Sequence, residues 1–286
     1  MPDPGNTPSS GIQELVIDRV GETAHERTSD FLAVEEPLEI RLAFGDEDSR
    51  SQQSISITMR TPGDDFELAA GFLLSEGLVE SREQIRSIRH CGRPSDGSLS
   101  NVVLVDLAPS AVVDVGRLKR HFYTTSSCGV CGKGSIEALQ VGNPTPLPVS
   151  GNAARRHVIR SLPSRLAEAQ TNFARTGGLH AAGLFDLAGS LLALREDVGR
   201  HNAVDKLIGG ELLAGRVPLP DRILMLSGRV SFELVQKALI AAIPIVVAVG
   251  APSSLAIETA RAFRMTVIGF TREDRFNLYS GEERIV

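Results

Sequence analysis

The strongest constraint on the fold is the alternation of apolar strands with helices in the second half of the chain. Near-continuous apolar strands separated by helices are typical of a parallel or mixed sheet that helices cover on both faces. We therefore predict an α/β subdomain over residues 157–286, built on a mixed sheet. Strands are predicted at 181–186, 190–195, 222–226, 243–249 and 265–270, and helices at 163–175, from 201 onward, at 232–242 and at 255–263.

Ligands of such sheets bind beyond the carboxyl ends of the strands, and the segments that follow predicted strands carry suitable side chains. Arg200 and His201 lie in a run dense in charged residues, 195–206. A solvated helix start would explain some of these charges, but not their concentration directly after a strand. The turn Ser227-Gly228-Arg229 opens a helix, where an anion is favoured, although ordinary turn chemistry explains that turn at least as well when it is taken alone.

A third segment after a strand reads Phe270-Thr271-Arg272-Glu273-Asp274-Arg275. Its two arginines could bind a phosphate through bidentate hydrogen bonds. If the strands alternate with helices as predicted, all three segments converge on one edge of the sheet. The sequence therefore predicts a phosphate-binding edge there.

The first third of the chain predicts a smaller α+β subdomain over residues 12–115. A helix is predicted to begin at Asp64 with a capping-box-like start completed by Glu67. Ile55, Ile57 and Met59 alternate with polar neighbours, which is the period of a half-buried strand. Strands are predicted at 14–19, 38–44, 54–60, 85–89 and 101–107. Residues 1–11 are rich in Pro, Gly and Ser and are predicted to form a disordered tail.

Between the two subdomains, residues 116–156 are rich in glycine, proline and hydroxyl residues and are predicted to form a mobile loop. The loop carries a C-x-x-C motif, Cys128 and Cys131, whose sulfurs could share a metal, form a disulfide or pass a sulfur atom between them. Glycine-rich backbone and nearby cations favour the thiolate, which makes either sulfur a candidate nucleophile. A structural zinc site, completed by His90 and Cys91, stays open as an alternative.

Composition excludes several classes of protein. The net charge of −5 argues against a general nucleic-acid binder, which would present a basic face. Three cysteines are too few for a disulfide framework and favour a reducing compartment. The N-terminus has no signal-peptide pattern, and the longest apolar stretch, 239–249, is too short to span a membrane. We therefore expect a cytoplasmic protein.

Two known uses of C-x-x-C motifs fit this chain poorly. A zinc deaminase needs H-x-E followed by P-C-x-x-C, but here Ala182 replaces the glutamate after His180, and the histidine follows the cysteines. A thiol-disulfide redox protein would carry the motif at a helix start inside a βαβ unit, not in a long loop. A thiol-disulfide redox protein, and a binding module in which the cysteines only bind a structural zinc ion, remain the alternative functions.

Taken together and in this order, four motifs resemble the FdhD family of formate dehydrogenase accessory sulfurtransferases, over roughly residues 14–286. The motifs are residues 127–132 (SCGVCG), 176–180 (TGGLH), 197–206 (DVGRHNAVDK) and 227–229 (SGR). The resemblance implies a sulfur carrier, which accepts sulfur as a persulfide from a cysteine desulfurase. It then passes that sulfur to the bis(molybdopterin guanine dinucleotide) molybdenum cofactor, which formate dehydrogenase requires.

The resemblance also assigns roles to residues. Cys128 matches the persulfide cysteine, Cys131 its partner, and Phe270 to Arg275 the cofactor-binding segment. Arg200, His201 and the turn from Ser227 to Arg229 are further candidates for the cofactor, and a guanine nucleotide is expected to bind as its fragment. No resident metal is expected. The family fold is similar to cytidine deaminases, and its members form homodimers.

Overall fold

The computed structural model describes residues 11–91, 101–111, 145–149 and 153–286. The predicted tail is therefore described only at Gly11, which is buried and accepts a hydrogen bond from the backbone N–H of Val34. Most of the predicted loop 116–156, with Cys128 and Cys131, lies outside the described residues.

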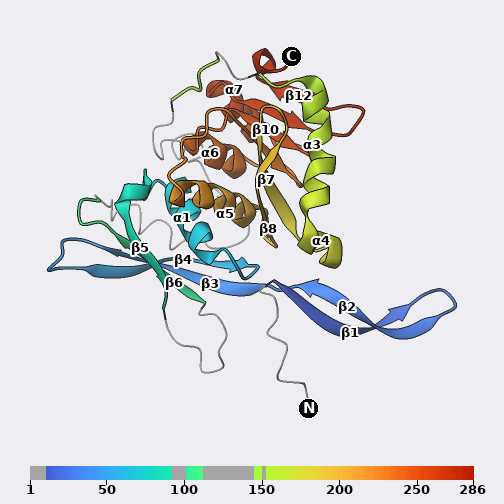
Figure 1. The fold of residues 1–286 in the computed structure, drawn as a ribbon, viewed down its shortest axis with the longest axis horizontal. Coiled ribbons are helices and arrows are strands. Elements are labelled where there is room, and N and C mark those ends of the chain that lie inside the picture. The colour runs from blue at the N-terminus through green and yellow to red at the C-terminus, as the bar shows by residue number, and fades with distance from the viewer. Residues whose placement is uncertain (1–10, 92–100, 112–144, 150–152) are drawn as a thin grey trace.

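The C-terminal part of the chain forms a six-stranded mixed sheet, as predicted (Figure 1). Its strand order is β12-β11-β10-β9-β7-β8, with β9, β10 and β11 parallel and the other pairs antiparallel. The strands are β7 (His180–Asp186), β8 (Leu191–Asp197), β9 (Arg222–Leu226), β10 (Ile245–Ala248), β11 (Thr266–Gly269) and β12 (Asn277–Ser280). β12, a short edge strand that is largely exposed, was not predicted.

Helices cover both faces of this sheet, which confirms the predicted layering (Figure 1). Helix α3 (Arg156–Ala169) packs on one face against Phe185, Met225 and Val247. The other face, with Leu184, Leu224 and Val246, is covered by α5 (Arg200–Leu213), α6 (Phe232–Ile240) and α7 (Ser254–Ala262). The short helix α4 (Thr171–Thr176) follows α3 directly.

Helix α3 differs from the prediction, because it begins at Arg156 and contains Pro163 instead of starting there. Val158, Ile159, Leu162 and Leu166 recur at helical spacing and are all buried against the sheet. Their burial outweighs the hydrogen bond that an internal proline removes. The end of the predicted loop is thus part of the fold.

The N-terminal subdomain is a four-stranded sheet of order β4-β3-β6-β5, covered by helix α1 (Asp65–Ser75). Its strands are β3 (Glu36–Phe44), β4 (Ser51–Arg60), β5 (Ile85–His90) and β6 (Val102–Leu107), and the 3-10 turn η1 (Arg82–Gln84) precedes β5. A second 3-10 turn, η3 (Glu282–Arg284), follows β12 near the C-terminus. α1 crosses α5 so closely that a side chain at Gly71 or Gly209 would clash with the backbone carbonyl of the other helix. One apolar cluster therefore continues from this subdomain into the C-terminal one.

Two local predictions for this subdomain are wrong. Asp64 adopts a left-handed conformation (φ 55°) and forms no side-chain cap, because Glu67 is engaged by Arg195 of β8 in a bidentate ion pair. In β4, Ile55 is buried, but Ile57 and Met59 are 58% and 47% exposed, because the pairing of β4 with β3 shifts register at Ile55 and breaks the alternation. Tertiary contacts, not local periodicity, decide both outcomes.

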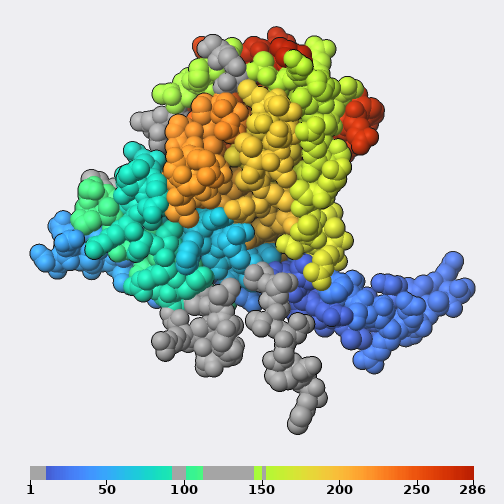
Figure 2. Space-filling view, viewed as in Figure 1, coloured from blue at the N-terminus to red at the C-terminus, as the bar shows by residue number. Residues whose placement is uncertain are grey.

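A two-stranded hairpin extends from the body of the molecule (Figure 2). Its strands, β1 (Ile12–Val20) and β2 (His25–Ala33), pair along nine residues each. The β2 sequence lacks apolar alternation, so only β1 was predicted. At its base the hairpin contacts α4, where the guanidinium of Arg175 lies 4.5 Å above the Phe31 ring.

Candidate functional site at the carboxyl edge of the C-terminal sheet

The strand directions bring all three predicted segments to one edge of the C-terminal sheet. The carboxyl ends of β9, β10 and β11 lie side by side because these strands are parallel and in register. β7 is antiparallel to β9, and β8 to β7, so the start of β7 (His180) and the end of β8 (Asp197) reach the same edge. Arg200 and His201, the turn 227–229 and the turn 270–275 all follow this edge.

The first part of the site surrounds His180. The backbone N–H of Ala181 donates to Ser227 Oγ at 2.8 Å, which fixes the turn after β9 against β7. A Cβ added at Gly228 would lie 3.3 Å from His180 Nδ1, so glycine lets the imidazole pack closely on that turn. On the other side, His201 Nε2 lies 3.2 Å from Ser231 Oγ, next to the start of α6. These contacts join the starts of β7, α5 and α6 into one surface.

Electrostatics at this surface favour a neutral His180 and an ionised Glu233. Burial lowers the pKa of His180, and interactions with the neighbouring side chains of Arg200 and His201 lower it further. On α6, interaction with His201, which lies 3.9 Å away, lowers the pKa of Glu233 to about 2, and Ser231 contributes to the shift. The neutral imidazole can donate or accept a hydrogen bond at physiological pH.

The charged run 195–206 separates into residues that hold the fold and residues that face the edge. Asp197 is fully buried and accepts from Lys206 Nζ at 2.8 Å, the Thr61 N–H at 3.1 Å and Asn202 Nδ2 at 3.0 Å. In α5, Asp205 is buried and accepts from Lys237 Nζ through both carboxylate oxygens at 2.8 Å. These groups join α5 to the N-terminal subdomain and to α6.

Of the charged run 195–206, Arg200 and His201 are the residues that lie at the edge of the sheet. Among the described residues Arg200 has no ion-pair partner, whereas Arg195 and Glu196 are engaged by Glu67 and by the first N–H groups of α4. Helix α5 begins at this edge without a side-chain cap, so its first N–H groups can receive an anion, whereas the start of α6 already carries the ionised carboxylate of Glu233. Arg229 of the neighbouring turn is exposed.

The second part of the site is the turn 270–275 at the far end of the edge. Phe270 adopts a left-handed backbone (φ 52°) with its ring 42% exposed, and its N–H donates to Gly250 O at 3.1 Å. Arg272 Nη1 donates to Val249 O at 3.0 Å, while Arg275, within the part of the chain that the structure describes, pairs with exposed Asp274 at 3.4 Å. Thr271 is fully buried, and Glu273 is exposed.

The two ends of this edge, after β8 and after β11, are too far apart to hold the same phosphate group. Four strand spacings separate the end of β8 from the end of β11, which is roughly 19 Å at about 4.8 Å per strand. The edge is therefore suited to an extended ligand with several anionic groups.

Because both cysteines of the C-x-x-C motif lie outside the described residues, their position relative to this edge remains a prediction.

Sequence reasoning used His180 only as part of a motif and did not include it among the site residues. The rule applied to the sequence selects segments that follow strands, whereas His180 begins a strand. Only the antiparallel pairing of β7 with β9 brings that start to the carboxyl edge. The motif TGGLH was the available signal.

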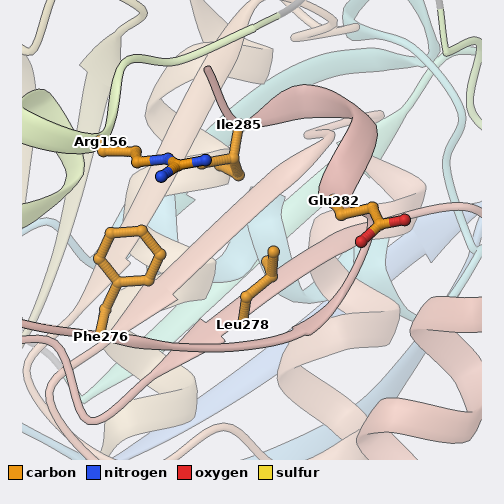
Figure 3. A pocket seen from close by; sticks show the side chains of 5 residues that line it. All are labelled: Arg156, Phe276, Leu278, Glu282 and Ile285. Atoms are coloured by element: carbon orange, nitrogen blue, oxygen red, sulfur yellow. The ribbon is translucent and has the colours of Figure 1, made fainter.

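A separate hollow of about 380 Å³ lies away from this edge, beside β12 (Figure 3). Phe276, Leu278 and Ile285 form its apolar floor, and the exposed side chains of Arg156 and Glu282 flank it. It shares no lining residue with the edge just described.

These observations define an α/β protein whose sheet edge gathers arginines, the uncapped start of α5 and a histidine with a lowered pKa, as in sites for large anionic ligands. Residues 33–286 match the FdhD/NarQ family. The chain therefore belongs to that family. Within the described residues, no helix is both long and apolar enough to cross a bilayer.

Two curated relatives are identical to this chain at nearly half of the aligned positions. The sulfur carrier protein FdhD of Streptomyces avermitilis is 48% identical over 276 residues, which cover 94% of each chain. The protein of that name from Mycobacterium tuberculosis is 48% identical over 260 residues, covering 89% of this chain and 91% of its own.

A crystal structure described as a putative formate dehydrogenase accessory protein from Desulfotalea psychrophila has the same fold. It superposes with a TM-score of 0.73 at 25% identity and covers 96% of this chain and 100% of its own. The likeness to cytidine deaminases is tested by none of these comparisons and stays a prediction.

Proposed function

We propose that this protein is a sulfur carrier that loads sulfur on Cys128 and delivers it to the bis(molybdopterin guanine dinucleotide) molybdenum cofactor for formate dehydrogenase. The observation that carries the proposal is the C-x-x-C motif in a chain whose close relatives are named sulfur carrier proteins. The structural relative is named for formate dehydrogenase, which supports the choice of client enzyme.

Loading conserves atoms and electrons. The Cys128 thiolate attacks the terminal sulfur of a persulfide on a cysteine desulfurase, the donor's sulfur–sulfur bond breaks, and the donor cysteine leaves as a thiolate. The terminal sulfur is then bonded to Cys128 as a new persulfide, with no external oxidant or reductant. Cys131 assists as the neighbouring thiol. The cofactor is the acceptor substrate of the second step.

The described edge supports this acceptor by its length and charge. The cofactor carries two dinucleotides and hence several phosphates, and the edge offers guanidinium groups at both of its ends: Arg200, beside His201, at one end, and Arg272 and Arg275 at the other. Helix starts and guanidinium groups are the usual partners of phosphates. Phe270, exposed at the same edge, presents an aromatic face to the ligand.

Mass spectrometry of the intact protein tests the loading step. After incubation with a cysteine desulfurase and cysteine, the parent should gain the mass of one sulfur atom, and Cys128→Ser should not, because a hydroxyl cannot form a persulfide. Cys91→Ser is the matched control, since Cys91 is half-buried at the end of β5 and should not affect loading. Full loading of Cys128→Ser, or stoichiometric zinc bound instead of sulfur, would contradict the proposal.

The remaining partners belong to the same proposal. We place the protein in the cytoplasm, with a cysteine desulfurase as donor, formate dehydrogenase as client and a second copy of the chain as a homodimer partner. Exposed Leu15, Val16 and Val20 on the hairpin are apolar groups that a partner could cover. Light scattering after gel filtration should give twice the monomer mass, and a monomer at micromolar concentration would contradict the dimer.

A further inference from the structure

The hairpin formed by β1 and β2 projects from the body of the molecule (Figure 2). Its strands have nine residues each, so it is about 30 Å long at about 3.3 Å per residue. A two-stranded hairpin by itself is only marginally stable in water and needs a further strand or a packed face. Four large apolar side chains on it are nevertheless exposed: Leu15, Val16, Val20 and Leu32. These features indicate that a partner covers the hairpin.

One face of the hairpin is packed at its base and open at its far end. Val16, Asp18 and Val20 share this face because side chains alternate along a strand, and the register places Arg27 opposite Asp18. At the base the same face packs on α4 through Phe31. Towards the tip Val16 is 56% and Val20 73% exposed, and Asp18 and Arg27 are exposed as well. The open end therefore presents two valines with a carboxylate and a guanidinium between them.

The hollow beside β12 offers the complementary surface. Figure 3 shows the side chains of Arg156 and Glu282 on opposite sides of an apolar floor. That floor consists of Phe276, Leu278 and Ile285, and Leu278 is exposed. At about 380 Å³ the hollow is large enough to take up aliphatic side chains. Like the end of the hairpin, it combines an apolar centre with one cation and one anion.

The two surfaces lie at opposite ends of α3. The hollow adjoins Arg156, the first residue of this helix, whereas the hairpin contacts α4, which follows the last turn of α3. The 14 residues of α3 separate them by about 21 Å at about 1.5 Å per residue. In Figure 1 the hairpin leaves the body near α4, and β12 and the C-terminus lie near the other end of α3. The hairpin of one chain thus points away from the hollow of the same chain.

A two-fold axis resolves this separation. An axis perpendicular to α3 reverses the direction of the helix, so the hairpin of each copy comes to lie beside the hollow of the other. Both contacts then form at once, as in an isologous dimer. A second copy fits better than an unrelated protein, because both halves of the contact are present in the one chain.

We propose that the hairpin is a dimerisation arm that docks in the hollow beside β12 of a second copy of this chain. Val16 and Val20 cover the apolar floor, Asp18 meets the partner's Arg156, and Arg27 meets the partner's Glu282. Residues 12–33 and the lining of the hollow supply about as many residues as one side of a standard interface, about 20–30. The inference rests on the homodimer of the proposed function and assigns its interface.

Sedimentation equilibrium of the full chain tests the apolar part of the contact. Val20→Asp, at an exposed position, should raise the dimer dissociation constant at least about tenfold, because the change buries a carboxylate in both copies of the contact. Thermal unfolding verifies that the variant is folded.

Exchanging charges tests the ionic part. The hairpin exchange combines Asp18→Arg with Arg27→Asp, and the hollow exchange combines Arg156→Glu with Glu282→Arg. Each exchange preserves the net charge but brings like charges together across the interface, so each alone should weaken the dimer at least about tenfold. Both exchanges in one chain should return the dissociation constant to within about threefold of the parent.

The matched control is the same kind of exchange on the opposite face of the hairpin. Arg19 and Glu26 are an exposed cross-strand ion pair there, with 3.5 Å between their charged groups. Arg19→Glu with Glu26→Arg should leave the dissociation constant within about twofold of the parent.

The outcomes separate this inference from the proposed function. A parent that sediments as a monomer at micromolar concentration removes the homodimer of the proposed function, and the inference with it. If the parent is a dimer and Val20→Asp or either single exchange dimerises as tightly, only the inference is overturned. The same holds if the chain with both exchanges stays as weak as either alone. Sulfur loading of Cys128, measured separately, tests the rest of the proposed function.

Discussion

Replacing Lys206 with methionine tests whether the charged run 195–206 serves the fold as well as the ligand. Lys206 is 1% exposed, and its Nζ lies 2.8 Å from both Asp197 Oδ2 and Thr61 O. Methionine keeps the volume of the side chain but leaves the fully buried carboxylate of Asp197 without its counter-ion. Three neutral donors remain to it: the N–H groups of Thr61 and Gly199 and the amide of Asn202.

The expected cost is large compared with the stability of a typical domain. Removing one partner of a buried ion pair costs about 3–5 kcal/mol, against a total free energy of unfolding of about 5–15 kcal/mol. With a urea m-value of about 3 kcal/mol/M, the unfolding midpoint of Lys206→Met should fall by about 1 M or more. Circular dichroism during urea unfolding measures this shift.

Two further variants make the test specific. Arg19→Ala removes an exposed ion pair with Glu26 on the hairpin and should change stability by less than about 1 kcal/mol. Adding Asp197→Asn to Lys206→Met removes the uncompensated charge, so part of the lost stability should return. A free energy of unfolding for Lys206→Met within about 0.5 kcal/mol of the parent's value would refute this expectation.

Two other predictions concern the edge and its pH dependence. Removing Arg272 and Arg275 together should weaken the binding of guanosine diphosphate at least about tenfold, which corresponds to about 1.4 kcal/mol of binding free energy. Cys128 should still load sulfur. Unchanged affinity in calorimetry, or loss of loading in the mass assay, would contradict that separation. Because His201 lowers the pKa of Glu233 from 4.5 to about 2, the ionised carboxylate stabilises the fold above about pH 4.5. That stabilisation is lost as the pH falls through 2. Glu233→Gln should therefore be less stable than the parent near pH 6, by about 1 kcal/mol after allowance for its exposure. Denaturation curves should converge near pH 2, and a difference independent of pH would exclude this origin.

Local sequence patterns were sufficient to predict five of the six strands of the C-terminal sheet, all except β12. Two of the predicted strands, 222–226 and 243–249, are short apolar runs, each bounded by a turn and followed by a helix. Since such runs must be buried on both faces, the mixed sheet and its helical layers follow from the sequence. The carboxyl edge follows as well, because parallel strands end on the same side.

The tertiary structure alone decided which residues of that edge are available to a ligand. Asp197 and Arg200 have equally polar side chains three positions apart, yet Asp197 is buried against Thr61, 136 residues earlier in the chain, while Arg200 faces the edge. A local sequence pattern cannot predict a contact between residues so far apart in the chain.

The same limit applies to His180. It reaches the edge because β7 runs antiparallel to β9. Strand direction and helix junctions depend on how distant segments pack. The composition and spacing of a segment determine what it can form, whereas its neighbours in space determine which of its polar groups are left for a ligand.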